Sequence, residues 1–116
     1  MSVRVKRVYE KAGKADGYRI LVDRLWPRGL NKSEAQIDQW LKEIAPSTRL
    51  RKWFRHDPGR RKEFKTKYWA ELDNCREEVE KLAQRARRRT VTLLFSAKDT
   101  EYNNAVALKE YIEQLL

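Results

Sequence analysis

The stretch YRILVDRLWPRGL, residues 18–30, decides the fold of this chain, because an apolar run ends there in a cluster of charged side chains. Ile20, Leu21 and Val22 form a continuous apolar segment, which is typical of a strand buried on both faces. Pro27 favours an extended conformation at Trp26 and ends the strand. The sequence therefore predicts a strand over residues 18–26, followed by a type I turn over residues 26–29.

Residues 90–95, TVTLLF, form a second apolar run of the same kind. Helical patterns lie between the two runs and after the second, so we expect parallel strands joined by a helical crossover. Residues 4–9 predict a shorter strand, which is either antiparallel to 18–26 or joined to it by an extended link, because residues 11–17 are too few for a helix. The predicted fold is one α/β domain over residues 1–116, with a small, mainly parallel sheet of about three strands covered by helices.

Capping signals divide the remaining residues into helices. SEAQ at residues 33–36 matches a capping box and predicts a helix with apolar positions from 37 to 44 on one face. Ser47 or Thr48 caps a short helix that continues to Phe54. Asp57 and Pro58 begin a helical pattern over residues 59–88, with a break near 73–75 if Asn74 caps a second segment. A final amphipathic helix is expected over residues 103–116.

The two apolar runs end in similar chemistry. Ligands of open α/β sheets bind at the carboxyl ends of the strands, and there the sequence places Asp23, Arg24, Arg28, Ser96, Lys98 and Asp99. We interpret Asp23 and Asp99 as candidate catalytic groups with acid–base or orienting roles, and Arg24, Arg28 and Lys98 as candidate anion-binding groups. The structural alternatives are that Asp23 pairs with a neighbouring cation, that Arg28 is a solvated turn residue, and that Asp99 caps the last helix.

Residues 46–58, PSTRLRKWFRHDP, form a second dense stretch of polar and basic side chains. Ser47 and Thr48 are helix caps or anion-binding hydroxyls. Arg51 lies four residues before Arg55, so the two could form a phosphate clamp on one helix face. His56 is the sole histidine and is a candidate acid–base group near neutral pH, or an exposed structural residue.

The chain carries a net charge of +10, which favours anionic partners, either a phosphorylated small molecule or nucleic acid, although charge also serves solubility. Basic side chains also end the 59–88 pattern, at Arg85, Arg87, Arg88 and Arg89. Such cations stabilise the carboxyl end of a helix through its dipole, and the alternative is a nucleic-acid-binding patch.

Several classes of chemistry are excluded by composition and motif. One histidine and one cysteine cannot supply an ordinary structural zinc site, and the glycine-rich nucleotide loops and the serine hydrolase motif are absent, so we expect no metal and no cofactor. No run approaches the roughly 20 apolar residues of a membrane span, so we expect no membrane partner. The lack of a signal peptide pattern and the single Cys75 favour the cytoplasm. The sequence does not indicate an oligomeric state.

The motifs LVDRLWPRG (21–29), APSTRLRKWF (45–54), HDP (56–58) and AKD (97–99) resemble the YeaO-like branch of the domain of unknown function 488 family. The resemblance covers nearly the whole chain and implies a small prokaryotic α/β protein of the cytosol with no established activity. It also implies that a histidine often follows the asparagine of the last motif, where this chain has Asn104 after Asn103. If that histidine is catalytic, this chain lacks it.

Three functional hypotheses follow. The leading one is a binder of an anionic, phosphate-bearing or nucleotide-like small molecule at the strand ends, with or without enzymatic activity. The second is a nucleic-acid-binding or transcription-associated regulatory protein that uses residues 85–89 together with 49–55. The third is a module that binds a protein partner without catalysis.

Overall fold

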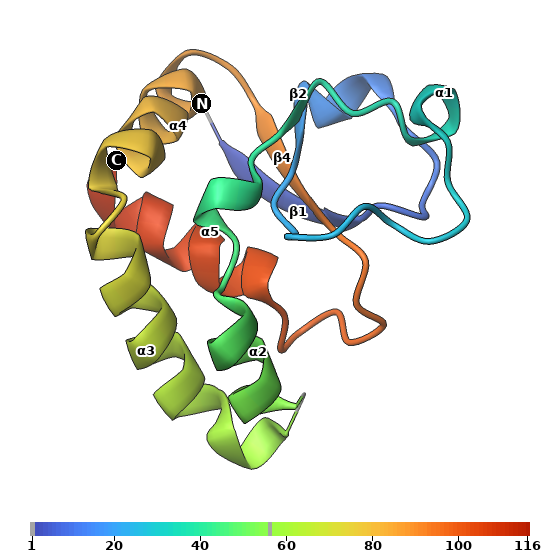
Figure 1. Cartoon of the computed structure of the whole chain (residues 1–116). Helices are drawn as coiled ribbons and strands as arrows, with labels where there is room; N and C mark the ends of the chain where they lie inside the picture. The colour runs from blue at the N-terminus through green and yellow to red at the C-terminus, as the bar shows by residue number, and fades with distance from the viewer. Residues whose placement is uncertain (1, 56) are drawn as a thin grey trace.

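Four parallel strands form the sheet in the computed structural model, which describes residues 2–55 and 57–116. Their spatial order is β1-β4-β2-β3, with β1 at Val3–Arg7, β2 at Tyr18–Leu21, β3 at Gln39–Trp40 and β4 at Val91–Phe95 (Figure 1). β4 is central, and all of its residues are buried. The predicted parallel α/β sheet is thereby confirmed, and β3 is the strand that the sequence did not indicate.

β1 and β2 do not pair with each other. Both pair with β4, with Val5 and Ile20 on either side of Leu93, and both run parallel to it. Residues 8–17 therefore return from the carboxyl end of β1 to the amino end of β2, and they contain the short 3-10 helix η1, Lys14–Asp16. Of the two alternatives left open by the sequence, the extended link is the one found.

The described residues also form five α-helices: α1 (Lys32–Ala35), α2 (Thr48–Phe54), α3 (Arg61–Asp73), α4 (Arg76–Arg88) and α5 (Asn104–Leu115). The predicted cap of α2 is confirmed, because the Ser47 side chain accepts a hydrogen bond from Leu50 N. Asp57 likewise caps the 3-10 helix η3, Pro58–Arg60, as predicted. The final helix is also confirmed, with Asn103 as its cap.

The helical pattern over 59–88 is broken into α3 and α4, so of the two possibilities that the sequence left open the interrupted helix is the one found. Cys75, with φ −124° and ψ 37°, is the first residue outside helical geometry, and no side chain caps α4. The prediction of Asn74 as the cap is therefore wrong, although the position of the break is right. The break lets both α3 and α4 pack against α5.

The predicted helix over residues 33–45 is wrong. Asn31, and not Ser33, is the cap, and it exchanges capping-box hydrogen bonds with Glu34. Gln36 then adopts a left-handed conformation (φ 47°) that ends α1 after one turn. The following residues form β3 instead, because the edge of β2 offers unpaired backbone groups, and Leu41 N donates to Leu21 O at 2.9 Å. The 3-10 helix η2, Lys42–Ile44, completes the segment.

The two faces of the sheet are covered differently. The larger core packs one face against the helices and includes Ile20, Leu93, Phe64, Tyr68 and Leu108. On the other face, Val8, Leu21 and Leu94 are buried beneath partly buried side chains of the loop after β2 and of β3, namely Trp26, Leu30, Ile37 and Trp40. The loop that carries the predicted site is thus itself held down by apolar packing.

A buried charge network fixes the amino edge of the sheet. Asp16 is 2% exposed and contacts Lys6 and Arg19, while Gly13 N donates to its carboxylate. Burial by itself raises the pKa of Asp16, but the Gly13 hydrogen bond and the two cations outweigh it, so the pKa lies below its ordinary value. Next to it Gly17 has φ +64°, and a Cβ there would lie 2.2 Å from Thr90 O, so only glycine fits.

Candidate functional site

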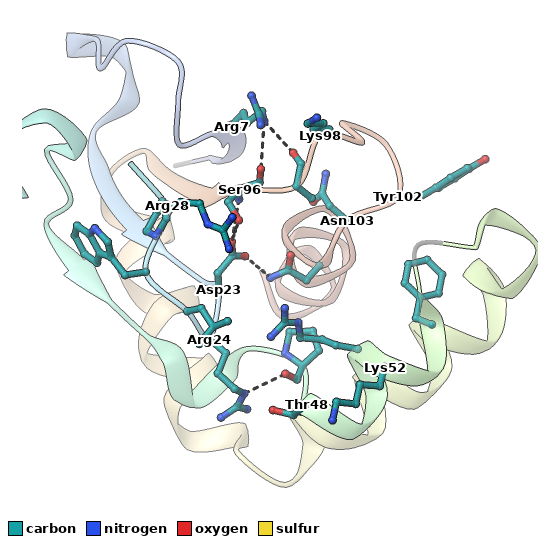
Figure 2. Close-up of a pocket in the computed structure, with 18 of the residues that line it drawn as sticks. Arg7, Asp23, Arg24, Arg28, Thr48, Lys52, Ser96, Lys98, Tyr102 and Asn103 are labelled. Atoms are coloured by element: carbon teal, nitrogen blue, oxygen red, sulfur yellow. Dashed lines mark hydrogen bonds between the residues drawn. The ribbon is translucent and has the colours of Figure 1, made fainter. Parts of the chain in front are cut away.

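A cavity of about 770 Å³ lies at the carboxyl edge of the sheet (Figure 2). Its lining comes from the ends of β1, β2 and β4, from α2, and from the amino end of α5. We call it the carboxyl-edge cavity. The parallel direction of the strands explains its position, because all of them deliver their following residues to one edge.

Positive charge dominates the carboxyl-edge cavity. Six cationic side chains line it: Arg7, Arg24, Arg28, Arg51, Lys52 and Lys98. Asp23 is the one acidic residue among the lining residues that the structure describes. None of the six cations forms an ion pair with a carboxylate within residues 2–55 and 57–116. The described lining of the cavity therefore carries six positive charges against one carboxylate.

Asp23 connects three elements at the centre of this cavity (Figure 2). Its Oδ2 accepts hydrogen bonds from Ser96 N at 2.9 Å and Ser96 Oγ at 2.8 Å, just after β4. Its Oδ1 accepts from Asn104 Nδ2 at 3.1 Å, at the start of α5, and the same amide donates to Val22 O at 3.0 Å. The residue at the position of the expected histidine is thus a neutral amide that holds Asp23 in place.

Two of the arginines are oriented by backbone carbonyls. Arg7 Nε donates to Ala97 O at 3.0 Å, and the Arg7 guanidinium lies 4.7 Å from the centre of the Tyr9 ring. Arg24 Nη2 donates to Ala45 O at 3.2 Å. A guanidinium has five N–H donors, so both arginines keep further donors for a ligand.

Apolar and aromatic side chains form the rest of the lining. Trp26, Phe54 and Phe64 contribute ring surface, and Tyr102, 38% exposed, lies at the side of the cavity in Figure 2. Trp26 is fixed by a hydrogen bond from its Nε1 to Leu30 O at 2.6 Å. The cavity therefore combines fixed cations with flat apolar surface.

The turn that presents Arg28 differs from the prediction by one residue. It lies at Arg28 and Gly29, and Gly29 adopts a positive φ of 83°. A glycine with positive φ at the third position of a turn is typical of type II, and not of the type I turn predicted over residues 26–29. Tyr9 Oη donates to Arg28 O at 2.7 Å and holds the turn against the end of β1.

The structure brings most of the predicted site residues together. The lining includes six of them: Asp23, Arg24, Arg28, Thr48, Arg51 and Lys98. Ser47 is not among the lining residues, because its N and Oγ both donate to the Glu71 carboxylate. His56, a candidate for acid–base work, lies outside the described residues.

Asp99 is not among the lining residues either. Its Oδ1 accepts hydrogen bonds from Glu101 N and Tyr102 N, both at 2.9 Å, and thereby shapes the loop between β4 and α5. The cap of α5 is Asn103 instead. The helix-cap interpretation of Asp99 is therefore wrong, whereas its candidate catalytic role stays a prediction.

Among the lining residues that the sequence did not indicate as site residues are Arg7, Lys52 and Asn104. Arg7 ends β1, so it would have been included if the parallel direction of that strand had been settled. Lys52 follows from helical spacing, since it lies four residues after Thr48 on the same face of α2. The clamp of Arg51 with Arg55 is not found, because Arg55 is not in the lining and its Nε donates to Lys52 O.

The arginines at residues 85–89 lie at the opposite, amino edge of the sheet, where α4 ends and β4 begins. The Arg85 guanidinium stacks 3.8 Å from the centre of the Tyr18 ring, and Arg89 lies 5.8 Å from the same ring. Arg87 donates to Leu115 O, while Arg88 is exposed. Three of the four therefore have structural contacts, and they do not adjoin the carboxyl-edge cavity.

Cys75 lies far from the cavity in the break between α3 and α4 and is partly buried. Burial, with the nearby Glu78 and Glu71, raises the pKa of its thiol, which disfavours the reactive thiolate. Among the described residues, no three histidine, cysteine, aspartate or glutamate side chains are grouped so as to hold a metal ion. In that same part of the chain, no helix has the length and apolarity to cross a membrane.

Comparison with known families agrees with the motifs. The model described as the inactive DUF488-N3 subclade matches residues 2–116. The chain belongs to this subclade. It is 46% identical to the uncharacterized protein YeaO of Escherichia coli strain K12, over 99% of this chain and 100% of YeaO.

A second relative is less similar in sequence. The chain is 38% identical to the uncharacterized protein Rv3073c of Mycobacterium tuberculosis strain H37Rv, over 95% of this chain and 92% of that protein. No solved structure matches the chain. The comparisons thus establish membership of the subclade and bring no ligand or reaction with them.

Proposed function

We propose that this protein binds an anionic, phosphate-bearing small molecule in the carboxyl-edge cavity and does not convert it. The observation that carries this proposal is the set of six lining cations around a single carboxylate. Charge-assisted hydrogen bonds to phosphate are stronger than neutral ones, and guanidinium groups match phosphate oxygens in pairs. A bound phosphate would supply negative charge to balance the lining cations, for which the lining itself provides a single carboxylate.

The shape and composition of the cavity favour an organic phosphate over a bare ion. Its volume of about 770 Å³ is typical of small-molecule sites and far exceeds what a single phosphate fills. The rings of Trp26 and Tyr102 offer surface for the rest of the molecule, and the buried rings of Phe54 and Phe64 lie behind the lining. A nucleotide, or another phosphate that carries a ring, would place its phosphate against the cationic side chains and its ring against the aromatic ones.

Binding without conversion is supported by the surroundings of Asp23. Both of its oxygens accept hydrogen bonds, and the donors are Ser96 and Asn104, neither of which exchanges a proton near neutral pH. These hydrogen-bond donors hold the carboxylate in place, and the described lining residues include no second carboxyl group and no imidazole that could share acid–base work with it. The description of the matching subclade as inactive agrees with this arrangement.

Isothermal titration calorimetry and thermal shift measurements with pyrophosphate, sugar phosphates and nucleotides test the proposal. The Arg28→Gln and Arg51→Gln variants should each weaken the binding of a hit by about tenfold or more, the loss of one charge-assisted contact. Arg88→Gln is the matched control, because it removes one positive charge at the opposite edge of the sheet. The proposal is wrong if none of these compounds binds, or if the control weakens binding as much as the cavity variants.

A further inference from the structure

Most of the chain's excess positive charge lies in one projecting part of the fold. Residues 48–67, which we call the basic hairpin, hold nine lysines and arginines against two acidic residues. Its described residues form α2, η3 and the first half of α3. Figure 1 shows α2 and α3 side by side at the end of the molecule away from α1.

The basic hairpin continues the positive surface of the carboxyl-edge cavity. Thr48, Arg51 and Lys52 line the cavity, at the three- and four-residue spacing of one helix face. Arg49, Lys52 and Trp53 have the same spacing and occupy the next face of α2. Lys52 belongs to both sets, so the positive charge passes from inside the cavity to the outer face of the hairpin without interruption.

Trp53, a partly buried aromatic side chain at the margin of the larger core, is flanked by cations. The guanidinium of Arg60 lies 5.2 Å from the centre of the Trp53 ring, and Lys67 Nζ lies 5.1 Å from it. Arg60 also contacts Asp57 at 3.7 Å, but both side chains are about half exposed, so this pair neutralises little charge. Within residues 2–55 and 57–116, Arg49 and Lys67 form no ion pair.

Cations that follow a groove and accompany an aromatic ring are the pattern by which proteins hold unpaired nucleic acid strands. From this continuity we propose that the basic hairpin binds a single-stranded nucleic acid. One nucleotide of the strand lies in the carboxyl-edge cavity, and the following phosphates pass Lys52 towards Arg49, Trp53 and Lys67. This inference rests on the proposed function, because the nucleotide in the cavity is the phosphate-bearing ligand proposed above.

The geometry favours a single strand over the other polyanions. A cavity of about 770 Å³ admits one unstacked nucleotide but not a base pair with its backbones. α2 has seven residues, or roughly 10 Å, which is short for a helix that reads a duplex groove. An acidic peptide or an anionic membrane would use the exposed cations but would have no use for the ring-lined cavity beside them.

Fluorescence anisotropy with labelled oligothymidylates of about 2, 4 and 12 nucleotides tests the inference, with thymidine monophosphate as the mononucleotide reference. The longest strand should bind at least about tenfold more tightly than the mononucleotide. The Arg49→Gln/Lys67→Gln variant, which changes no residue of the cavity, should weaken the binding of the longest strand and leave that of the mononucleotide unchanged. For the longest strand, the slope of log Kd against the logarithm of the salt concentration should be smaller in this variant than in the wild type. The decrease should be about 0.7 for each phosphate contact that the variant loses.

The control variant is Lys32→Gln/Arg88→Gln, which removes two exposed positive charges outside the hairpin and should leave strand binding unchanged. If the mononucleotide binds but longer strands bind no more tightly, the inference is wrong and the proposed function stands. If neither binds, the inference is wrong, and the proposed function is then decided by its own test with pyrophosphate, sugar phosphates and other nucleotides. Tighter binding of polyglutamate or of phosphatidylglycerol vesicles than of the oligothymidylates would also overturn the inference, as would equal losses in the two double variants.

Discussion

The Asp23→Asn variant tests whether the Asp23 carboxylate stabilises the fold or contacts the ligand, because the two roles predict different changes in stability and in anion affinity. The substitution keeps the shape of the side chain and replaces one oxygen by an amide. If the remaining oxygen keeps the two hydrogen bonds from Ser96, the new amide faces Asn104 Nδ2, and two donors meet. Rotating the Asn104 amide removes this conflict but breaks its hydrogen bond to Val22 O. At least one buried hydrogen bond is lost in either arrangement.

The expected cost is about 1–3 kcal/mol in the free energy of unfolding, the usual penalty of one unsatisfied partly buried group. For a domain of this size, that corresponds to a fall in Tm of about 4 °C per kcal/mol. Anion affinity should change in the opposite direction. Asp23 is the acidic group among the described lining residues, so its neutralisation removes repulsion and should tighten the binding of a phosphate-bearing hit by about tenfold.

Differential scanning fluorimetry measures the first effect, and calorimetric titration measures the second. Asn104→Ala is the matched control, because it removes the donor to Asp23 and to Val22 O but leaves every charge in place. It should lower Tm without tightening anion binding. An Asp23→Asn variant with unchanged Tm and weaker anion binding would refute the reasoning, because the carboxylate would then act on the ligand rather than on the fold.

Three further predictions concern stability and reactivity. Gly17→Ala should lower the free energy of unfolding by roughly 3 kcal/mol, because its Cβ would meet Thr90 O at 2.2 Å at a positive φ, whereas Gly13→Ala, with nothing within 4 Å, should change it little; urea unfolding of both checks this. Since the folded-state pKa of Asp16 is lowered, its stabilising contribution is complete above the unfolded value of about 3.9 and is lost as pH falls through the folded pKa. Urea unfolding between neutral and acid pH should therefore show a smaller decline for Asp16→Asn than for the wild type, and equal declines would contradict the pKa direction. The Cys75 thiol, whose pKa is raised, should react with Ellman's reagent more slowly in the folded protein than in urea, and equal rates would show that the thiol is not protected.

The fold class and half of the site followed from sequence patterns that act locally. An apolar run that ends in charged residues marks a buried strand and its exit, and two such runs separated by helices must be parallel. This reasoning placed Asp23, Arg24, Arg28 and Lys98 at one edge, and the carboxyl-edge cavity contains all four. The predicted caps Ser47 and Asp57 also held, because a cap depends on backbone groups within three residues.

Where contacts between distant segments decide the structure, the local sequence patterns led to wrong predictions. The apolar spacing of residues 37–44 fits a helix, yet the free edge of β2 recruits residues 39–40 into β3. The sequence suggested Asp99 as a catalytic group and Ser47 as a helix cap or an anion-binding hydroxyl. In the structure Asp99 Oδ1 accepts hydrogen bonds from the backbone of the following loop, and Ser47 donates to the Glu71 carboxylate. A side chain's neighbours along the chain do not reveal such partners.

The sequence by itself determined that two buried parallel strands end in cations at a common edge, because strand burial and direction follow from apolar runs and helical connections. Only the tertiary structure decided that β1 joins them in parallel and adds Arg7, that α2 forms the facing wall with Arg51 and Lys52, and that Asn104 holds Asp23. The physical reason is the distance along the chain over which each interaction acts. Hydrophobic periodicity and capping act within a few residues, whereas a cavity is enclosed by segments far apart in the chain, whose packing sets which side chains face one another.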